Sequence, residues 1–198
     1  MTMIGLIRHG VTDWNFEYRA QGQADIPLND EGLRQAELLS RRMKNEEWDY
    51  IYSSDLTRAL QTARAIGRVK NIEVKTDQRL REMDCGLIEG TTEADRVGKW
   101  GYAWSKLDLG IESTDSIFIR GMSCITEISE RHPNQKILIV SHGALLGLTL
   151  KKLIPHVDTE EHIENTSLTI LNKVDDRWDC QLYNCTQHLK TENIADRD

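Results

Sequence analysis

The sequence lacks the features that mark membrane-spanning and secreted proteins. No stretch approaches the roughly 20 consecutive apolar residues that a membrane-spanning helix needs. Residues 1–9 show no basic start, no long apolar centre and no small-residue cleavage site. The four cysteines are too few and too scattered for a disulfide framework. We therefore expect a cytoplasmic protein with reduced thiols and no membrane partner.

A block of basic residues is also missing. The chain has 25 Lys and Arg against 32 Asp and Glu, which gives a net charge of −7. This acidic balance argues against nucleic acid as a partner. An anionic ligand would have to be held by a local cluster of positive groups, because the overall field of the protein repels it.

The length and the uninterrupted pattern indicate one domain. A chain of 198 residues is close to the roughly 150 residues of an average domain and is long enough to bury a substantial core. The sequence has no internal repeat, low-complexity tract or interior linker. We expect a single domain over residues 1–190, followed by a polar C-terminal tail at residues 191–198.

Segments with the hydrophobic pattern of strands alternate with segments that have the pattern of helices. We predict strands at residues 3–7, 50–52, 72–74 (weak), 137–140, 168–170 and 178–182, with a hairpin turn at residues 174–176. We predict helices at residues 33–43 with Asn29 as N-cap, 56–66 with Gly67 as the stop, 115–131 and 143–154. This alternation predicts an α/β fold: a three-layer α/β/α sandwich with a mostly parallel sheet and an antiparallel strand near the C-terminus.

Charged and imidazole side chains follow three of the predicted strands. Arg8-His9-Gly10 ends the first strand, Arg58 lies in the first turn of the helix after the second, and His142-Gly143 ends the apolar run at 137–140. The carboxyl ends of parallel strands meet at one edge of a sheet, where ligands bind. A lone histidine or arginine at such a place is more often structural, but the convergence of two arginines and two histidines predicts an anion site, with phosphate as the anion.

The opening octet Arg8-His9-Gly10-Val11-Thr12-Asp13-Trp14-Asn15 resembles the R-H-G-x-T/S-x-x-N signature of the histidine phosphatase superfamily, which includes the cofactor-dependent phosphoglycerate mutases. Further blocks that resemble the family follow in order through nearly the whole chain: Gln21-Gly22 with Pro27-Leu28, residues 53–63, residues 80–90, Gly110-Ile111-Glu112-Ser113 with Arg120, Ser141-His142-Gly143, and Asn165-Thr166-Ser167. The resemblance implies a phosphoglycerate mutase-like fold.

The resemblance also implies roles for individual residues. His9 matches the nucleophile that becomes phosphohistidine, and Glu82 matches the proton donor, with Glu89 as a rival in the same block. The other catalytic groups of the phosphate pocket would be Arg8, Arg58 and His142. The substrate-binding positions would be Asn15, Gln21, Gly22 and Gly143.

The chemistry of these residue types agrees with those roles. A neutral imidazole nitrogen is a competent nucleophile near pH 7, and fixed arginine and histidine donors stabilise a transferring phosphoryl group. A carboxyl group can protonate the leaving alcohol and then activate water. We expect no metal and no cofactor, because the arginines neutralise the charge. A metal held by His9, Glu82 and His142, or a zinc held by Cys180, Cys185 and His188, is a disfavoured alternative.

The chain departs from the mutases of the family in two respects. It is too short for the insertion that those mutases carry after the acid block. It also continues from His142-Gly143 into apolar Ala144 and Leu145, without polar partners for a phosphoglycerate carboxylate. We therefore predict a metal-independent phosphatase that hydrolyses small-molecule phosphate monoesters. The alternatives are a mutase, and a regulatory module that binds phosphate without catalysis.

Residues 91–110 form the least regular stretch and occupy the place of the mutase insertion. They contain Trp100 and Trp104, which would share a face if both lay on one helix. Either the two indoles pack this stretch onto the core, or at least one covers an apolar or ring-bearing leaving group at the mouth of the pocket. We retain both as candidate substrate-binding residues.

Overall fold

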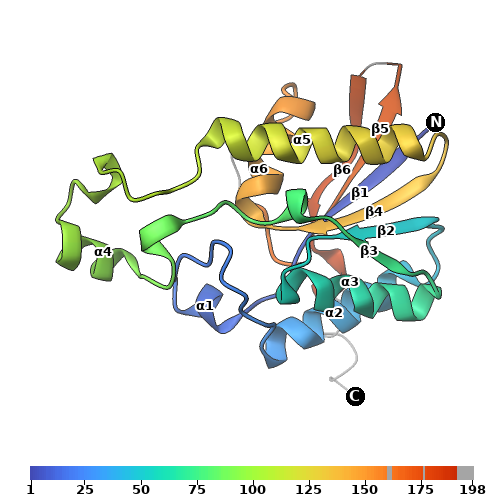
Figure 1. Cartoon of the computed structure of the whole chain (residues 1–198). Helices are drawn as coiled ribbons and strands as arrows, with labels where there is room; N and C mark the ends of the chain where they lie inside the picture. The colour runs from blue at the N-terminus through green and yellow to red at the C-terminus, as the bar shows by residue number, and fades with distance from the viewer. Residues whose placement is uncertain (160–161, 176, 191–198) are drawn as a thin grey trace.

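The computed structural model describes residues 1–159, 162–175 and 177–190. Its centre is a six-stranded sheet in the order β3-β2-β4-β1-β5-β6 (Figure 1). The strands are β1 (Met3–Arg8), β2 (Tyr50–Ser53), β3 (Val74–Thr76), β4 (Lys136–Ser141), β5 (Leu168–Val174) and β6 (Arg177–Cys185). The α-helices are α1 (Asp13–Phe16), α2 (Asp30–Met43), α3 (Thr57–Lys70), α4 (Glu93–Trp100), α5 (Thr114–Arg131) and α6 (Gly143–Leu153).

The sheet is mixed, as predicted. Strands β1, β2, β3 and β4 pair in parallel with one another, whereas β5 is antiparallel to β1 and β6 is antiparallel to β5. The parallel strands therefore end at the same edge of the sheet. This register places Arg8 beside Ser141 and Ser53 beside Val140.

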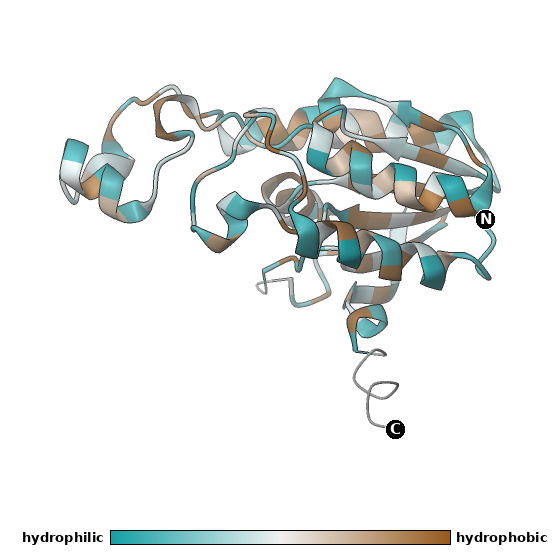
Figure 2. Cartoon of the chain, turned by 90° about the horizontal axis from the view of Figure 1, so that it is seen from below, coloured by the Kyte–Doolittle hydropathy of each residue, from teal (hydrophilic) through white to brown (hydrophobic). Residues whose placement is uncertain are grey.

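Helices cover both faces of the sheet and complete the predicted three layers, with α5 and α6 on one face and α2 and α3 on the other (Figure 1). The run Ile137–Val140 is fully buried because alternate side chains enter the two cores, Ile137 and Ile139 on the α5/α6 side and Leu138 and Val140 on the α2/α3 side. In Figure 2 the central strands are mostly hydrophobic, while the helices alternate hydrophilic and hydrophobic residues along their length.

Most predicted helix boundaries agree with the structure, but Gly67 does not end its helix. Asn29 is the N-cap of α2, as predicted, and its side chain accepts from the Gly32 N–H at 2.9 Å. Helix α3 continues through Gly67 to Lys70, and Asn71 ends it in the left-handed region at φ 53°. Gly67 lies inside the helix because the chain returns against it: a Cβ there would be 2.8 Å from the carbonyl oxygen of Ile72.

Other predicted regions also differ from the structure. The third strand begins at Val74, so residue 72 precedes it. The stretch predicted to be irregular contains α4 and a short 3₁₀ helix, Trp104–Lys106, and it projects from the body of the molecule in Figure 1. Of the predicted hairpin turn, residue 176 lies outside the described residues, as does the tail at 191–198. No helix within the described ranges is long and apolar enough to cross a membrane.

Candidate active site

The carboxyl ends of β1 and β4 bring two histidines together. Arg8 and Ser141, the last residues of these strands, are partners in the parallel register. His9 and His142 follow them, with ring centroids 5.1 Å apart and ring planes inclined by 56°. Both side chains are buried. The strand pattern predicted this juxtaposition, and the sheet register is its cause.

His9 has one ring nitrogen fixed by a backbone carbonyl. Its Nδ1 lies 2.7 Å from the carbonyl oxygen of Gly10, which can only accept, so Nδ1 carries the proton and Nε2 carries the lone pair. Burial holds the pKa of His9 well below its usual value, and the charges of Arg58 and Arg8 act in the same direction. The ring is therefore neutral at pH 7, the form in which Nε2 is a nucleophile.

Gly10 is required by close packing of the chain. A Cβ at this position would lie 2.7 Å from the carbonyl oxygen of Gly32, near the start of α2. The Gly10 N–H donates to Thr62 Oγ1 on α3 at 3.0 Å. The group whose close approach this glycine permits is thus the backbone of α2. Both helices on the α2/α3 face fix the turn that follows the nucleophile.

Arg58, in the first turn of α3, has a fully buried guanidinium group. Its Nη1 and Nη2 donate to the carbonyl oxygens of Ala24 and Gly22 at 2.8 and 2.7 Å. Its Nε is buried and has no hydrogen-bond partner within the described part of the chain. Burial lowers the pKa of Arg58 to about 10, against the opposing effect of the Glu82 carboxylate, so the group stays charged at pH 7.

Arg8 is held by a loop that precedes β5. Its Nη1 donates to His162 Nε2 at 2.6 Å and to the Ile163 carbonyl oxygen at 2.7 Å. Its Nε is buried without a partner among the described residues, and a Cβ at Gly143 would lie 3.3 Å from it. Any larger residue at position 143 would therefore crowd this nitrogen. Burial lowers the pKa of Arg8, and the Glu82 carboxylate opposes the shift.

His142 is the N-cap residue of α6, and both of its ring nitrogens are buried without a hydrogen-bond partner in the described chain. Burial, followed by the charge of Arg58, holds the pKa of His142 well below its usual value. The neutral ring has one N–H to donate. Buried donors without partners are rare and costly. Together with the two Nε atoms of the arginines, this N–H suits the oxygens of a bound phosphoryl group beside His9.

Glu82 places its carboxylate on the N-terminus of α6. Its Oε2 accepts from the Ala144 N–H at 3.1 Å, and its Oε1 accepts from Leu145 and Met83 at 3.2 and 2.9 Å. The first N–H groups of a helix have no partners within the helix and favour an anion. Glu82 therefore lies on the same helix start that His142 caps.

Glu89, the rival acid, performs a different structural task. Its Oε1 accepts from the Gln23 N–H at 2.6 Å. Gly22 has φ +51°, and a Cβ there would lie 2.1 Å from the same oxygen, so only glycine fits. Glu89 thus fixes the turn whose carbonyl oxygens hold Arg58.

Two predicted binding residues, Asn15 and Gln21, form none of the contacts described above. Asn15 completes the capping box of α1, whose N-cap is Thr12: Asn15 Oδ1 accepts from the Thr12 N–H at 3.0 Å, and the Asn15 N–H donates to Thr12 Oγ1 at 3.3 Å. Gln21 has a buried Oε1 without a partner among the described residues. A direct role of either side chain in substrate binding stays a prediction.

Trp100 and Trp104 do not lie on one helix, so the condition for a shared helix face is not met. Trp100 is the last residue of α4, Gly101 ends the helix at φ +79°, and Trp104 begins the following 3₁₀ helix. Trp104 donates from Nε1 to Glu93 at 2.8 Å, and the guanidinium carbon of Arg96 lies 4.8 Å from its ring centroid. Both indoles are half-buried against the small cluster of Cys85, Ile88 and Leu109. Their role in substrate binding stays a prediction.

The sequence reasoning missed His162, the imidazole that accepts from Arg8. Burial and the charge of Arg8 lower the pKa of His162, in agreement with an unprotonated Nε2. This contact joins residues 154 positions apart, so no local spacing signals it. Its only sequence signal is its position just before Asn165, whose Nδ2 donates to the His9 carbonyl oxygen at 2.8 Å.

Among the described residues, no group of three His, Cys, Asp or Glu side chains is arranged to hold a metal ion. In the zinc alternative from the sequence, Cys180 Sγ faces the Leu182 carbonyl oxygen at 3.5 Å and Cys185 Sγ accepts from Arg42 at 3.5 Å.

Comparison with known proteins gives matches over nearly the whole chain. The family model for the histidine phosphatase superfamily (branch 1) matches residues 4–186. Phosphoglycerate mutase-like protein 4 of Arabidopsis thaliana is 33% identical over 94% of this chain and 86% of its own. The uncharacterized phosphatase PhoE of Bacillus subtilis (strain 168) is 31% identical over 96% and 97%. The structure of a phosphoserine phosphatase mutant from Entamoeba histolytica in complex with phosphoserine has a TM-score of 0.80 at 28% identity and covers 96% of this chain and all of its own.

Proposed function

The chain belongs to the histidine phosphatase superfamily, and from that premise we propose that it hydrolyses phosphate monoesters of small molecules through a phosphohistidine on His9. The observation that carries the proposal is the state of His9: a neutral ring with Nδ1 fixed on a carbonyl and Nε2 left as nucleophile, beside buried donors of Arg8, Arg58 and His142. The phosphatase relatives support the same reaction class.

In the first step, His9 Nε2 attacks the phosphorus and the bond to the ester oxygen breaks. Arg8, Arg58 and the His142 N–H stabilise the negative charge on the equatorial oxygens. Glu82 gives its proton to the departing alkoxide. A metal ion is unnecessary on this proposal, since two guanidinium groups supply the positive charge.

In the second step, the Glu82 carboxylate takes a proton from water, and the water oxygen attacks the phosphorus of phosphohistidine. The N–P bond breaks, its electron pair returns to Nε2, and phosphate leaves. Glu82 is protonated again and ready for the next ester. The same carboxyl group thus acts as acid and then as base.

Turnover of p-nitrophenyl phosphate and trapping of the intermediate test this function. We expect the protein to incorporate ³²P from a labelled ester in an acid-labile, base-stable form, the behaviour of a phosphohistidine. His9→Ala should abolish labelling and turnover while the protein stays folded. The matched control is His156→Ala, an exposed histidine outside the site, which should behave as wild type. Acid-stable labelling would refute the assignment of the nucleophile.

A mutase is the second candidate, because one relative is named as phosphoglycerate mutase-like. Incubation with 3-phosphoglycerate and 2,3-bisphosphoglycerate distinguishes the two: formation of 2-phosphoglycerate identifies a mutase, and release of phosphate identifies a phosphatase. Absence of turnover on any ester, with retained binding of phosphate, would indicate a binding module.

A further inference from the structure

The segment that carries Glu82 is fastened by its backbone carbonyl groups. The four consecutive carbonyl oxygens of residues 79–82 each accept a hydrogen bond from a side chain. Ser141 Oγ, beside His142, donates to the Leu80 carbonyl at 2.7 Å. Arg120 on α5 donates to the other three: its Nη1 to Arg79 at 2.8 Å and Arg81 at 2.6 Å, and its Nη2 to Glu82 at 2.8 Å.

Glu112 uses the donors of Arg120 that remain. The Arg120 Nε and Nη2 donate to Glu112 Oε1 and Oε2 at 2.9 and 2.8 Å in a bidentate pair. All five N–H groups of Arg120 are thereby used within the protein, so it has none left for a ligand. The pair is largely buried, with 19% and 13% of the two side chains exposed. Hydrogen bonds from Arg120 and Ser116 lower the pKa of Glu112 to about 2.

Glu112 also holds the far side of the acid segment. Its Oε2 accepts from the Asp84 N–H at 3.2 Å, and its backbone N–H donates to the Asp84 carbonyl at 2.8 Å. The two side chains therefore fix the backbone both before and after Glu82. The peptide groups that flank Glu82 have no freedom to rotate without breaking several of these bonds.

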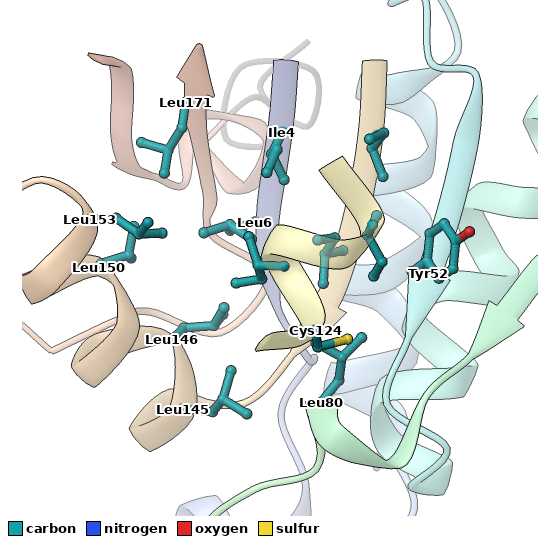
Figure 3. Close-up of a cluster of buried hydrophobic side chains, with 14 of the residues drawn as sticks. Ile4, Leu6, Tyr52, Leu80, Cys124, Leu145, Leu146, Leu150, Leu153 and Leu171 are labelled. Carbon is teal, nitrogen blue, oxygen red and sulfur yellow. The ribbon is translucent and has the colours of Figure 1, made fainter. Parts of the chain in front are cut away.

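Apolar contacts also hold the segment, because Leu80 and the half-buried Met83 pack against the α5/α6 core. Leu80 is fully buried in the α5/α6 core, near Cys124, which lies one turn after Arg120 on α5 (Figure 3). These two contacts fix where the segment lies, but an apolar contact is non-directional and does not orient the peptide groups around Glu82. Their orientation comes from directional hydrogen bonds: those of Arg120 and Ser141 to the carbonyl groups of residues 79–82, and those of Glu112 to Asp84.

We propose that Arg120 and Glu112 form a positioning pair that orients the Glu82 carboxyl group for proton transfer to the leaving group. The proposal rests on the proposed function, in which Glu82 is the proton donor. Proton transfer needs hydrogen-bond reach to the ester oxygen, and rotation of the peptide groups around Glu82 moves its carboxyl group out of reach. Neither member of the pair touches the reacting atoms.

The test compares an ester with a poor leaving group and one with a good leaving group. In Arg120→Met we expect kcat/KM for β-glycerophosphate to fall about 100-fold, as misplacement by about 1 Å can cause. For p-nitrophenyl phosphate, whose phenolate hardly needs a proton, kcat/KM should stay within about threefold. Arg120→Lys keeps the charge without the planar guanidinium group, and Glu112→Gln keeps an acceptor. In both variants kcat/KM for β-glycerophosphate should again fall more than kcat/KM for p-nitrophenyl phosphate, but by a smaller factor than in Arg120→Met.

The matched control is Arg79→Met. Arg79 forms ion pairs with Asp77 and with Glu127 of α5, at 2.7 and 2.8 Å, so the variant also loosens the contact between this segment and α5. It leaves the carbonyl bonds of Arg120 intact, because these use backbone oxygens. We expect a lower melting temperature with no difference between the two esters. A difference in kcat/KM loss between the two esters as large as that of Arg120→Met would overturn the proposal.

Combination with Glu82→Gln separates the failure of this proposal from the failure of the proposed function. If Arg120 acts through Glu82, adding Arg120→Met to Glu82→Gln should change kcat/KM for β-glycerophosphate by less than about threefold. Two results would overturn the positioning pair and leave the proton donor standing. One is a difference between the two esters in Glu82→Gln but not in the Arg120 and Glu112 variants; the other is an additive loss of kcat/KM in the double variant. Equal losses on both esters in Glu82→Gln would overturn the proton donor, and the pair with it. If Arg120→Met does not fold, Arg120→Lys and Glu112→Gln give the same comparison.

Discussion

Replacement of Glu82 by glutamine tests the assignment of the proton donor directly. Glutamine keeps the shape of the side chain but cannot release a proton to the leaving oxygen. We expect kcat/KM for an alkyl phosphate to fall by about 10² to 10⁴, the usual contribution of a general acid, which is about 3–5 kcal/mol of transition-state free energy. For p-nitrophenyl phosphate kcat/KM should change little. The ratio kcat/KM reports only the steps through phosphohistidine formation, so it isolates the departure of the leaving group.

The hydrogen bonds of Glu82 determine how much this substitution lowers the free energy of unfolding. The Glu82 carboxylate accepts three backbone hydrogen bonds, two at Oε1 and one at Oε2. A glutamine oxygen can keep the two at the Oε1 position, and its amide then faces the Ala144 N–H, donor against donor. One lost hydrogen bond with an unsatisfied group costs about 1–3 kcal/mol. Urea denaturation should therefore show a folded but less stable variant.

Glu89→Gln is the matched control in the same block. Glu89 accepts from the Gln23 N–H, next to the Gly22 carbonyl that holds Arg58. A glutamine oxygen can still accept from this N–H, so kcat/KM should change by the same small factor for both esters. The assay is a pair of initial-rate series, with stopped-flow detection of a p-nitrophenol burst in Glu82→Gln because hydrolysis of phosphohistidine also needs the carboxylate. Equal losses of kcat/KM on both esters in Glu82→Gln, or a larger difference between the two esters in Glu89→Gln, would refute the assignment of Glu82 as the proton donor.

Three further predictions concern metal, pH and the two tryptophans. Because Arg8 and Arg58 supply the positive charge, kcat should survive dialysis against EDTA; a loss that a divalent ion restores would contradict this. The pKa values of His9 and His142 are lowered in the folded protein, so at a pH below about 6.5, the usual histidine pKa, the unfolded chain binds more protons than the folded one. The free energy of unfolding should therefore decrease as the pH falls from 7.5 to 5.5, by an amount on the order of 1 kcal/mol for each histidine. Urea titrations of the wild type and of the His142→Asn variant check this, since the variant should lose less stability over that range. We expect Trp100→Ala and Trp104→Ala to raise KM for bulky aromatic esters but not for a small ester; a lower melting temperature with an unchanged substrate ranking would remove them from the binding site.

The elements that the sequence predicted well are those whose own pattern decides their structure. Residues 137–140 are apolar without interruption, and a strand buried on both faces is what the structure contains. Gly67 was predicted to end a helix from its local propensity alone. It continues the helix because Ile72, five residues later, turns back against its Cα. Tertiary packing outweighs the small helix propensity cost of a glycine, about 1 kcal/mol.

In the candidate active site, too, some features follow from a pattern in the sequence and others depend on contacts between distant residues. The rule that ligands bind at the carboxyl ends of parallel strands predicted that His9 and His142 meet, and the register of β1 and β4 brings them together. The side chains that hold Arg8 and Glu82 in place were not predictable from local spacing. Arg8 is held by His162, and Glu82 by Arg120, through contacts 154 and 38 residues apart in sequence. Such contacts have no period and no spacing, so only the folded chain reveals them.

The N-terminus of α6 couples the two halves of the proposed chemistry. His142 is its N-cap, and the one N–H of its neutral ring has no partner in the described chain and can donate to a phosphoryl group. The next N–H groups, from Ala144 and Leu145, bind the Glu82 carboxylate. A rigid helix therefore fixes the distance between a donor to the phosphoryl oxygens and the acid that protonates the leaving oxygen. Substrate enters a site in which both are already placed, so little further ordering is needed on the way to the transition state. A change within α6 that shifts its first turn should consequently alter phosphate binding and leaving-group protonation together, whereas the Arg120 and Glu112 variants alter only the second.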